Sequence, residues 1–184
     1  MKACCSNLTT QSAETKLPNK ARSTLLTSCV AHFLHDGLSD VLYVLFPVWN
    51  KEFLLTFSQV GLLRTVYSGA MSFFQIPAGI IAERWGETKL LFAGTLLCAI
   101  GFCLLQTVHT FPWLVLLLFL TGLGSSVQHP LCSALVSQAY EEGPRRTVLG
   151  TYNFTGDLGK MSLPVAITLL ITWFGWRSAT FCTG

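Results

Sequence analysis

Eight side chains that can carry a charge or a proton lie inside long apolar stretches of this 184-residue chain. A charge in the middle of a bilayer costs about 2.5–3.5 kcal/mol on insertion scales, so such groups need partners or a water-filled cavity. Ionisable residues at this depth are typical of transport pathways, and ion pairs that only hold helices together are the alternative. The eight are His32, His35, Asp36, Asp40, Arg64, His129, Asp157 and Lys160.

Two of the three carboxylates have an expected cation nearby. Asp40 and Arg64 would lie at similar depth, about 9–13 Å below one membrane surface at ~1.5 Å per residue, so neighbouring antiparallel helices would join them. Asp157 and Lys160 are three residues apart on one helix face and can pair locally. Asp36 is left without a dedicated cation, which predicts that it carries the proton of a coupled transport cycle.

His32 precedes Asp36 by four residues on the same helix face and can exchange a proton with it. We therefore expect proton coupling from His32, Asp36 and Asp40, with His35 a weaker member. The same spacing can bind a divalent metal, but other helices would have to complete such a site, and we assign neither a metal nor another cofactor. His129, just before Pro130, either caps a freed carbonyl or lies on the pathway.

The residue pattern does not favour an enzyme, and no catalytic residue is assigned. Ser125, Ser126 and His129 would lie on one helix, where a Ser–His pair of catalytic geometry does not form easily. An intramembrane protease would need its base on another helix, where His32 and His35 are the alternatives.

Composition and spacing indicate helices that cross a membrane. The chain is 51% hydrophobic and 11% charged, against roughly 25% charged in soluble domains, and a very apolar soluble bundle is the alternative. Each apolar run is near or above the ~20 residues that a spanning helix needs. Small residues within the runs favour close helix packing over separate lipid anchors. The sequence predicts an all-α, polytopic bundle with five spans and the start of a sixth near Ser178; the spans are 24–48, 59–82, 89–108, 112–138 and 148–173.

The distribution of positive charge predicts a cytoplasmic N-terminus. In that orientation only Lys51 and Arg177 lie outside, while Arg64 and Lys160 lie within spans. This orientation places eight basic residues inside and two outside, and the reverse orientation would exchange these two numbers. The eight inside residues are Lys2, Lys16, Lys20, Arg22, Arg84, Lys89, Arg145 and Arg146.

Two domains are expected: a disordered cytoplasmic tail over residues 1–22, which lacks the apolar region of a signal peptide, and an incomplete transmembrane domain over 23–184. The net charge of +3 and the scattered basic residues favour no nucleic-acid partner. The seven cysteines form no Cys-x-x-Cys pair, and those inside the apolar runs are expected to be reduced core residues: Cys29, Cys98, Cys103 and Cys132.

The segment 79–89, GIIAERWGETK, resembles the loop between the second and third helices of the major facilitator superfamily. Gly79 would let helices approach, Gly86 would turn the chain, and Glu83, Arg84 and Lys89 would latch helix ends and gate the cytoplasmic face. Glu83 stands where the family usually has Asp, and Glu87 and Thr88 stand where bases are common.

Four further segments are similar to the fosmidomycin-resistance branch of that superfamily: HFLHDGLSDVLYVLFPVW, GLLRTVYSGAMSFFQIPAG, GSSVQHP and GTYNFTGDLGKM. Gly175-Trp176-Arg177 is similar to the opening of the family's sixth helix. The fourth span lacks the Arg that proton-linked members often carry, and the fifth lacks the full glycine pattern of antiporters.

The resemblance implies the N-terminal half of a proton-driven antiporter that exports a drug-like molecule across the bacterial inner membrane. Arg64, His129 and Lys160, tuned by Asp157, would contact an anionic substrate, and Asn153 and Gln128 are further expected pathway residues. Proton-coupled or ion-coupled uptake by symport is one alternative, and a non-transporting membrane fragment or assembly subunit is another. The expected partners are lipid, a small-molecule substrate, protons and the C-terminal half, without which we expect no transport. Substrate identity, transport direction and oligomeric state do not follow from the sequence.

Overall fold

The computed structural model describes residues 19–141 and 143–184, and within them it contains helices and no strand. This confirms the expected all-α class. The expected tail over 1–22 falls largely outside the described residues, but the first helix already begins at Asn19. The helices are α1 (Asn19–Glu52), α2 (Phe57–Trp85), α3 (Glu87–Leu104), η1 (Leu105–Thr107), α4 (Phe111–Ser125), α5 (Gln128–Ala139) and α6 (Arg145–Thr183).

Four helical segments of the described chain are long and apolar enough to cross a membrane: α1, α3 with η1, α4 with α5, and α6. α2 has 29 residues, which is sufficient length for a crossing, but it is not among these four. Gly175, with φ 78° and ψ 160°, divides α6, so that the expected sixth helix begins at Trp176. Together these features make the chain a multi-pass membrane protein.

The expected fourth span is one apolar run that the structure divides between α4 and α5. The division at Ser126 and Val127 lies just before Pro130, which has no N–H to donate and whose ring clashes with the carbonyl four residues earlier. At the other end of the run, Pro112 lies in the first turn of α4, as expected. The break places His129 in the first turn of α5.

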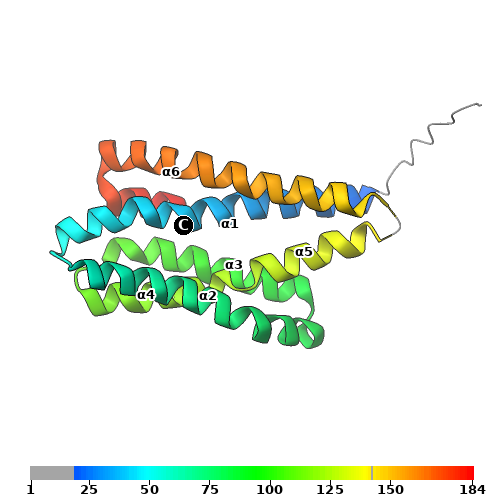
Figure 1. Ribbon diagram of the computed structural model, residues 1–184, viewed down its shortest axis with the longest axis horizontal. Helices are drawn as coiled ribbons and strands as arrows, with labels where there is room; N and C mark the ends of the chain where they lie inside the picture. Colours follow the sequence, from blue (N-terminus) through cyan, green and yellow to red (C-terminus); the bar gives the residue numbers. More distant parts are fainter. Residues whose placement is uncertain (1–18, 142) are drawn as a thin grey trace, which may run out of the picture.

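The helices form an elongated bundle in which α1 lies along α6, while α2 and α3 both lie along α4 (Figure 1). α1 and α2 follow each other in the chain but make few contacts. The largest side chains of the main core include Trp49 from α1, Tyr67 from α2 and Phe102 from α3. The same core contains Ile167 and Trp176 from α6, so it joins helices that are distant in sequence.

Basic residues gather at one end of the bundle. The start of α1, the connection from α2 to α3 and the connection from α5 to α6 lie at that end (Figure 1). The described basic residues near these segments are Lys20, Arg22, Arg84, Lys89, Arg145 and Arg146. Lys2 and Lys16, which were expected with them, lie outside the described residues.

The opposite end is closed by a polar contact between α1 and the segment after Gly175. The Glu52 carboxylate accepts hydrogen bonds from the Trp176 indole and from the Arg177 guanidinium. Arg177 also donates to the carbonyl of Val108 at 2.9 Å. Glu52 was not among the residues singled out in the sequence.

The described cysteines are free thiols, as expected for those inside the apolar runs. Cys98 and Cys132 are buried, Cys29 and Cys103 are partly buried, and Cys182 is exposed.

Candidate functional site

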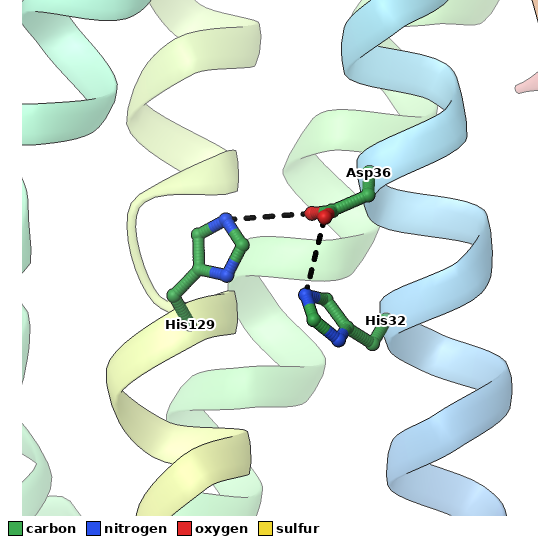
Figure 2. Close-up of side chains that lie close together, drawn as sticks. All are labelled: His32, Asp36 and His129. Atoms are coloured by element: carbon green, nitrogen blue, oxygen red, sulfur yellow. Dashed lines mark ion pairs between the residues drawn. The ribbon is translucent and has the colours of Figure 1, made fainter. Parts of the chain in front are cut away.

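Asp36 lies at the centre of a polar cluster built by α1, α5 and α6. Figure 2 shows the part of it that α1 and α5 supply, with His32 and His129 beside Asp36. Its side chain is 4% exposed. Oδ2 is 3.2 Å from His32 Nε2 on the same helix and 3.0 Å from Lys160 Nζ on α6. Oδ1 is 3.4 Å from His129 Nε2 on α5. The expected contact between His32 and Asp36 is confirmed, and α5 and α6 supply the other partners.

The expectation that Asp36 has no dedicated cation was wrong. Lys160 pairs with Asp157 at 3.1 Å, as expected, and it also reaches Asp36. Assigning one acid to each base overlooked that an ammonium has three donors and can bridge two carboxylates. Asp157 is 68% exposed and Lys160 43%, so Lys160 joins a buried acid to one on the surface.

His32 is held in a defined orientation by Tyr152, a residue that the sequence did not single out. Its Nδ1 is 2.9 Å from the Tyr152 carbonyl oxygen, and its ring stacks on the Tyr152 ring with 4.1 Å between centroids. A carbonyl can only accept, so Nδ1 carries the proton and Nε2 faces Asp36. Either a second proton or a cation must therefore lie between Nε2 and the carboxylate for the contact to be attractive.

Close approach of α6 to α1 depends on glycine. A Cβ added to Gly156 would lie 2.6 Å from His32 Cε1 and 2.8 Å from Asp36 Oδ2. A Cβ on Gly159 would collide with the backbone of Phe33. These small residues were expected to allow helix packing, and their place directly over the cluster emerges only from the structure.

The cluster borders a cavity of about 150 Å³ between α1, α2, α5 and α6. Asp40 and Arg64 both line this cavity, but their expected ion pair is not formed in the described part of the chain. The Arg64 guanidinium lies over the Tyr43 ring, 4.5 Å from its centroid. Arg64 thus reaches α1 at Tyr43 and not at Asp40, and this cation–π contact takes the place of the expected ion pair. The lining residues are Asp36, Ser39, Asp40, Arg64, Tyr67, Met71, His129 and Lys160.

A network of hydroxyl groups borders the cavity at Ser39 and Tyr67. The Tyr67 hydroxyl is 2.7 Å from Ser39 Oγ and 3.2 Å from Ser125 Oγ. Ser125 Oγ is also 3.4 Å from Cys98 Sγ. The sequence interpretation did not include Tyr67 or Ser39. In the sequence, the one sign of these two residues is that each is a polar residue inside an apolar span.

Two expected pathway residues lie away from this cavity. Gln128 is buried, donates to Cys132 Sγ at 3.2 Å, and lines a separate cavity with His35. Asn153 is exposed on α6. His129 is close enough to Asp36 for a charged contact, which favours the pathway interpretation over a carbonyl cap.

The residues of the loop between α2 and α3 meet the expectations for them only in part. Gly86 has a φ of 89° and turns the chain between α2 and α3, as expected. A Cβ on Gly79 would meet nothing within 4 Å, so no helix of the described residues packs closely against it and its expected role in helix approach stays a prediction. Glu83, Arg84 and Lys89 are exposed and outside the ion pairs of the described chain, while Glu87 accepts from Gln138 at 2.9 Å and ties the loop to α5.

Comparisons with known proteins match this architecture. The family model described as Major Facilitator Superfamily covers residues 28–184. The fosmidomycin resistance protein of Escherichia coli is 26% identical over 146 residues, which are 79% of this chain and 36% of that protein. YfnC, an uncharacterized MFS-type transporter of Bacillus subtilis, is 25% identical over 155 residues, 84% of this chain and 37% of that protein. The bacillibactin exporter of B. subtilis is 26% identical over 144 residues, 74% of this chain and 36% of that protein.

The chain thus spans about a third of the length of the curated relatives that it matches. The family match covers most of the chain, from the first turns of α1 to its last residue, and includes every helix that contributes to the cluster around Asp36. This chain belongs to the major facilitator superfamily, a family of membrane transporters.

Proposed function

We propose that this chain supplies the proton-coupling half of a transporter that exports a small drug-like molecule in exchange for protons. The observation that carries the proposal is the buried Asp36 carboxylate, which contacts two imidazoles and an ammonium beside a cavity. Two of the curated relatives are named for resistance to a drug and for export. The proposal includes a second half, supplied by the rest of the transporter, because alternating access requires two halves that move around a shared site.

The charges of the cluster support exchange of a proton for a cationic group. With both imidazoles neutral, Asp36, Asp157 and Lys160 sum to a charge of −1. One proton neutralises the cluster, and so does one cationic group of a substrate. Two cations that compete for the same carboxylate cannot bind together, and such competition produces antiport.

Uptake by symport is the second candidate, and the contact between Lys160 and Asp36 favours it for an anionic substrate. Protonation of Asp36 would release Lys160, which together with Arg64 could then bind the anion. Proton and anion would bind together in that case, and they would move in the same direction.

We propose that the protein lies in the bacterial inner membrane with its N-terminus in the cytoplasm. The basic residues at one end of the bundle support this orientation, because cytoplasmic loops carry an excess of Lys and Arg. The loop residues Glu83, Arg84 and Lys89 would then gate the cytoplasmic face, and Asn153, exposed on α6, would face the second half.

The test uses inverted membrane vesicles and a fusion in which residues 28–184 replace the matching segment of the E. coli fosmidomycin resistance protein. Respiration acidifies the vesicle lumen and quenches a pH-sensitive dye. Under antiport, a cationic drug-like probe such as ethidium, added outside, enters the vesicles as protons leave, and dye fluorescence recovers. Under symport the added compound produces no recovery.

Single-residue variants of the fusion test whether Asp36 carries the coupled proton. Asp36→Asn should abolish the recovery, since an amide cannot take up the proton. Glu87→Gln removes a carboxylate outside the cluster and should respond like the unmodified fusion. Full recovery in Asp36→Asn would refute the assignment of the proton to Asp36. If the E. coli protein gives the fluorescence recovery and the fusion does not, export of this compound by the fusion is refuted.

A further inference from the structure

We propose that His32, Asp36 and His129 form a binding site for one divalent transition-metal ion, such as Zn²⁺ or Co²⁺, which takes the place beside Asp36 that Lys160 holds in the structure. The two imidazoles and the carboxylate come from α1 and α5 and converge on one point (Figure 2). Binding of an ion requires no transport, so this inference is independent of the proposed function.

The distances between the ligand atoms fit a tetrahedral ion. Ligands at about 2.0–2.1 Å from a zinc ion in this geometry lie about 3.3–3.4 Å from each other. His32 Nε2 lies 3.2 Å from Asp36 Oδ2, and His129 Nε2 lies 3.4 Å from Asp36 Oδ1, so whichever oxygen binds the ion already has one imidazole nitrogen at this spacing. All three ligand atoms are within 4.8 Å of one another. Small movements of the partly exposed His129 would therefore complete the first coordination shell.

The orientation of His32 is that of a metal ligand. Its Nδ1–H donates to the Tyr152 carbonyl at 2.9 Å, which leaves the Nε2 lone pair directed at Asp36. Ligating histidines almost always donate their other N–H to a carbonyl, a carboxylate or water, which fixes the tautomer and the ring orientation. The ring is also clamped by stacking on Tyr152. This outer support is already present without an ion.

Lys160 is a tethered competitor for the same position. Its Nζ lies 3.0 Å from Asp36 Oδ2 and 3.1 Å from Asp157 Oδ1. When an ion binds Asp36, the ammonium keeps Asp157 as its partner, and the half-exposed Lys160 chain has room to move toward the surface. The vacated position is the fourth coordination site, which water fills. Two imidazoles with one carboxylate favour Zn²⁺, Co²⁺ or Ni²⁺ over Mg²⁺ or Ca²⁺.

The test is a titration of the 184-residue chain in detergent micelles with Co²⁺, whose visible absorption reports tetrahedral coordination, and with Zn²⁺ as the competitor. One equivalent of Co²⁺ should bind and Zn²⁺ should displace it. His32→Gln, Asp36→Asn and His129→Gln should each weaken binding at least about tenfold. His109→Gln, which changes an exposed histidine outside the cluster, should bind like the unmodified chain. All variants keep every cysteine, so thiol binding contributes equally to each.

Lys160→Met distinguishes the proposal from a general loss of structure. Removing the competing ammonium should tighten Co²⁺ binding by about fivefold, a gain that misfolding cannot produce. Unchanged or weaker binding in Lys160→Met would overturn the displacement of Lys160. Unmodified affinity in His129→Gln or Asp36→Asn would overturn the site itself.

Discussion

Replacing Gly156 by alanine should disturb the cluster directly, and the structure gives the size of the effect. The new methyl carbon would lie 2.6 Å from His32 Cε1 and 2.8 Å from Asp36 Oδ2. Ordinary contacts begin near 3.4 Å, so these atoms must move by about 0.6–0.8 Å or the helices must separate. Overpacking of this kind typically costs about 1–3 kcal/mol. We expect Gly156→Ala to lower the free energy of unfolding by about 2 kcal/mol.

The assay is reversible unfolding in mixed micelles with increasing denaturing detergent, followed by circular dichroism. Gly150→Ala is the matched control on the same helix, because a Cβ there would meet nothing within 4 Å. That control should be neutral or more stable by up to about 1 kcal/mol, since alanine favours helix over glycine. If Gly156→Ala were as stable as Gly150→Ala, α6 would not pack against α1 as the structure has it.

Three further predictions concern other parts of the bundle. Gly86→Ala should destabilise the chain by roughly 1 kcal/mol in the same assay, because a φ of 89° is strained for alanine, and an unchanged midpoint would contradict this backbone geometry. Glu52→Gln should speed hydrogen exchange in the segment after Gly175 by weakening the contact to Arg177; unaltered exchange would show that the contact does not hold this end. A cysteine at Lys89, in an otherwise cysteine-free chain, should react with an impermeant maleimide only from the cytoplasmic side, and labelling from the opposite side would reverse the proposed orientation.

Apolar run length and local spacing predicted the parts of the structure that depend on residues close in sequence. The helices, the turn at Gly86 and the contacts His32–Asp36 and Asp157–Lys160 all follow from spacing along one chain segment. The break at Ser126 and Val127 was not predicted, although Pro130 carries the signal for it.

Contacts between helices could not be derived in the same way. Neighbours in sequence were assumed to be neighbours in space, which led to an ion pair between Asp40 and Arg64 that the described chain does not form. Depth arithmetic places a side chain along the membrane normal but says nothing of its direction around the helix. The partners of Asp36 on α5 and α6 depend on that second coordinate, which is set by side-chain packing across the bundle.

The dependence of Asp36 on three helices links its ionisation to their arrangement. A buried carboxylate keeps its charge only while cations or protonated imidazoles remain within a few ångströms. His129 and Lys160 belong to α5 and α6, so a shift of either helix relative to α1 removes a partner and favours uptake of a proton or another cation. The break at Ser126 and Val127 separates α5 from α4. Binding at Asp36 and the arrangement of the helices belong to one free-energy cycle. A proton or a metal ion bound at Asp36 must therefore change the preferred positions of α5 and α6 in turn.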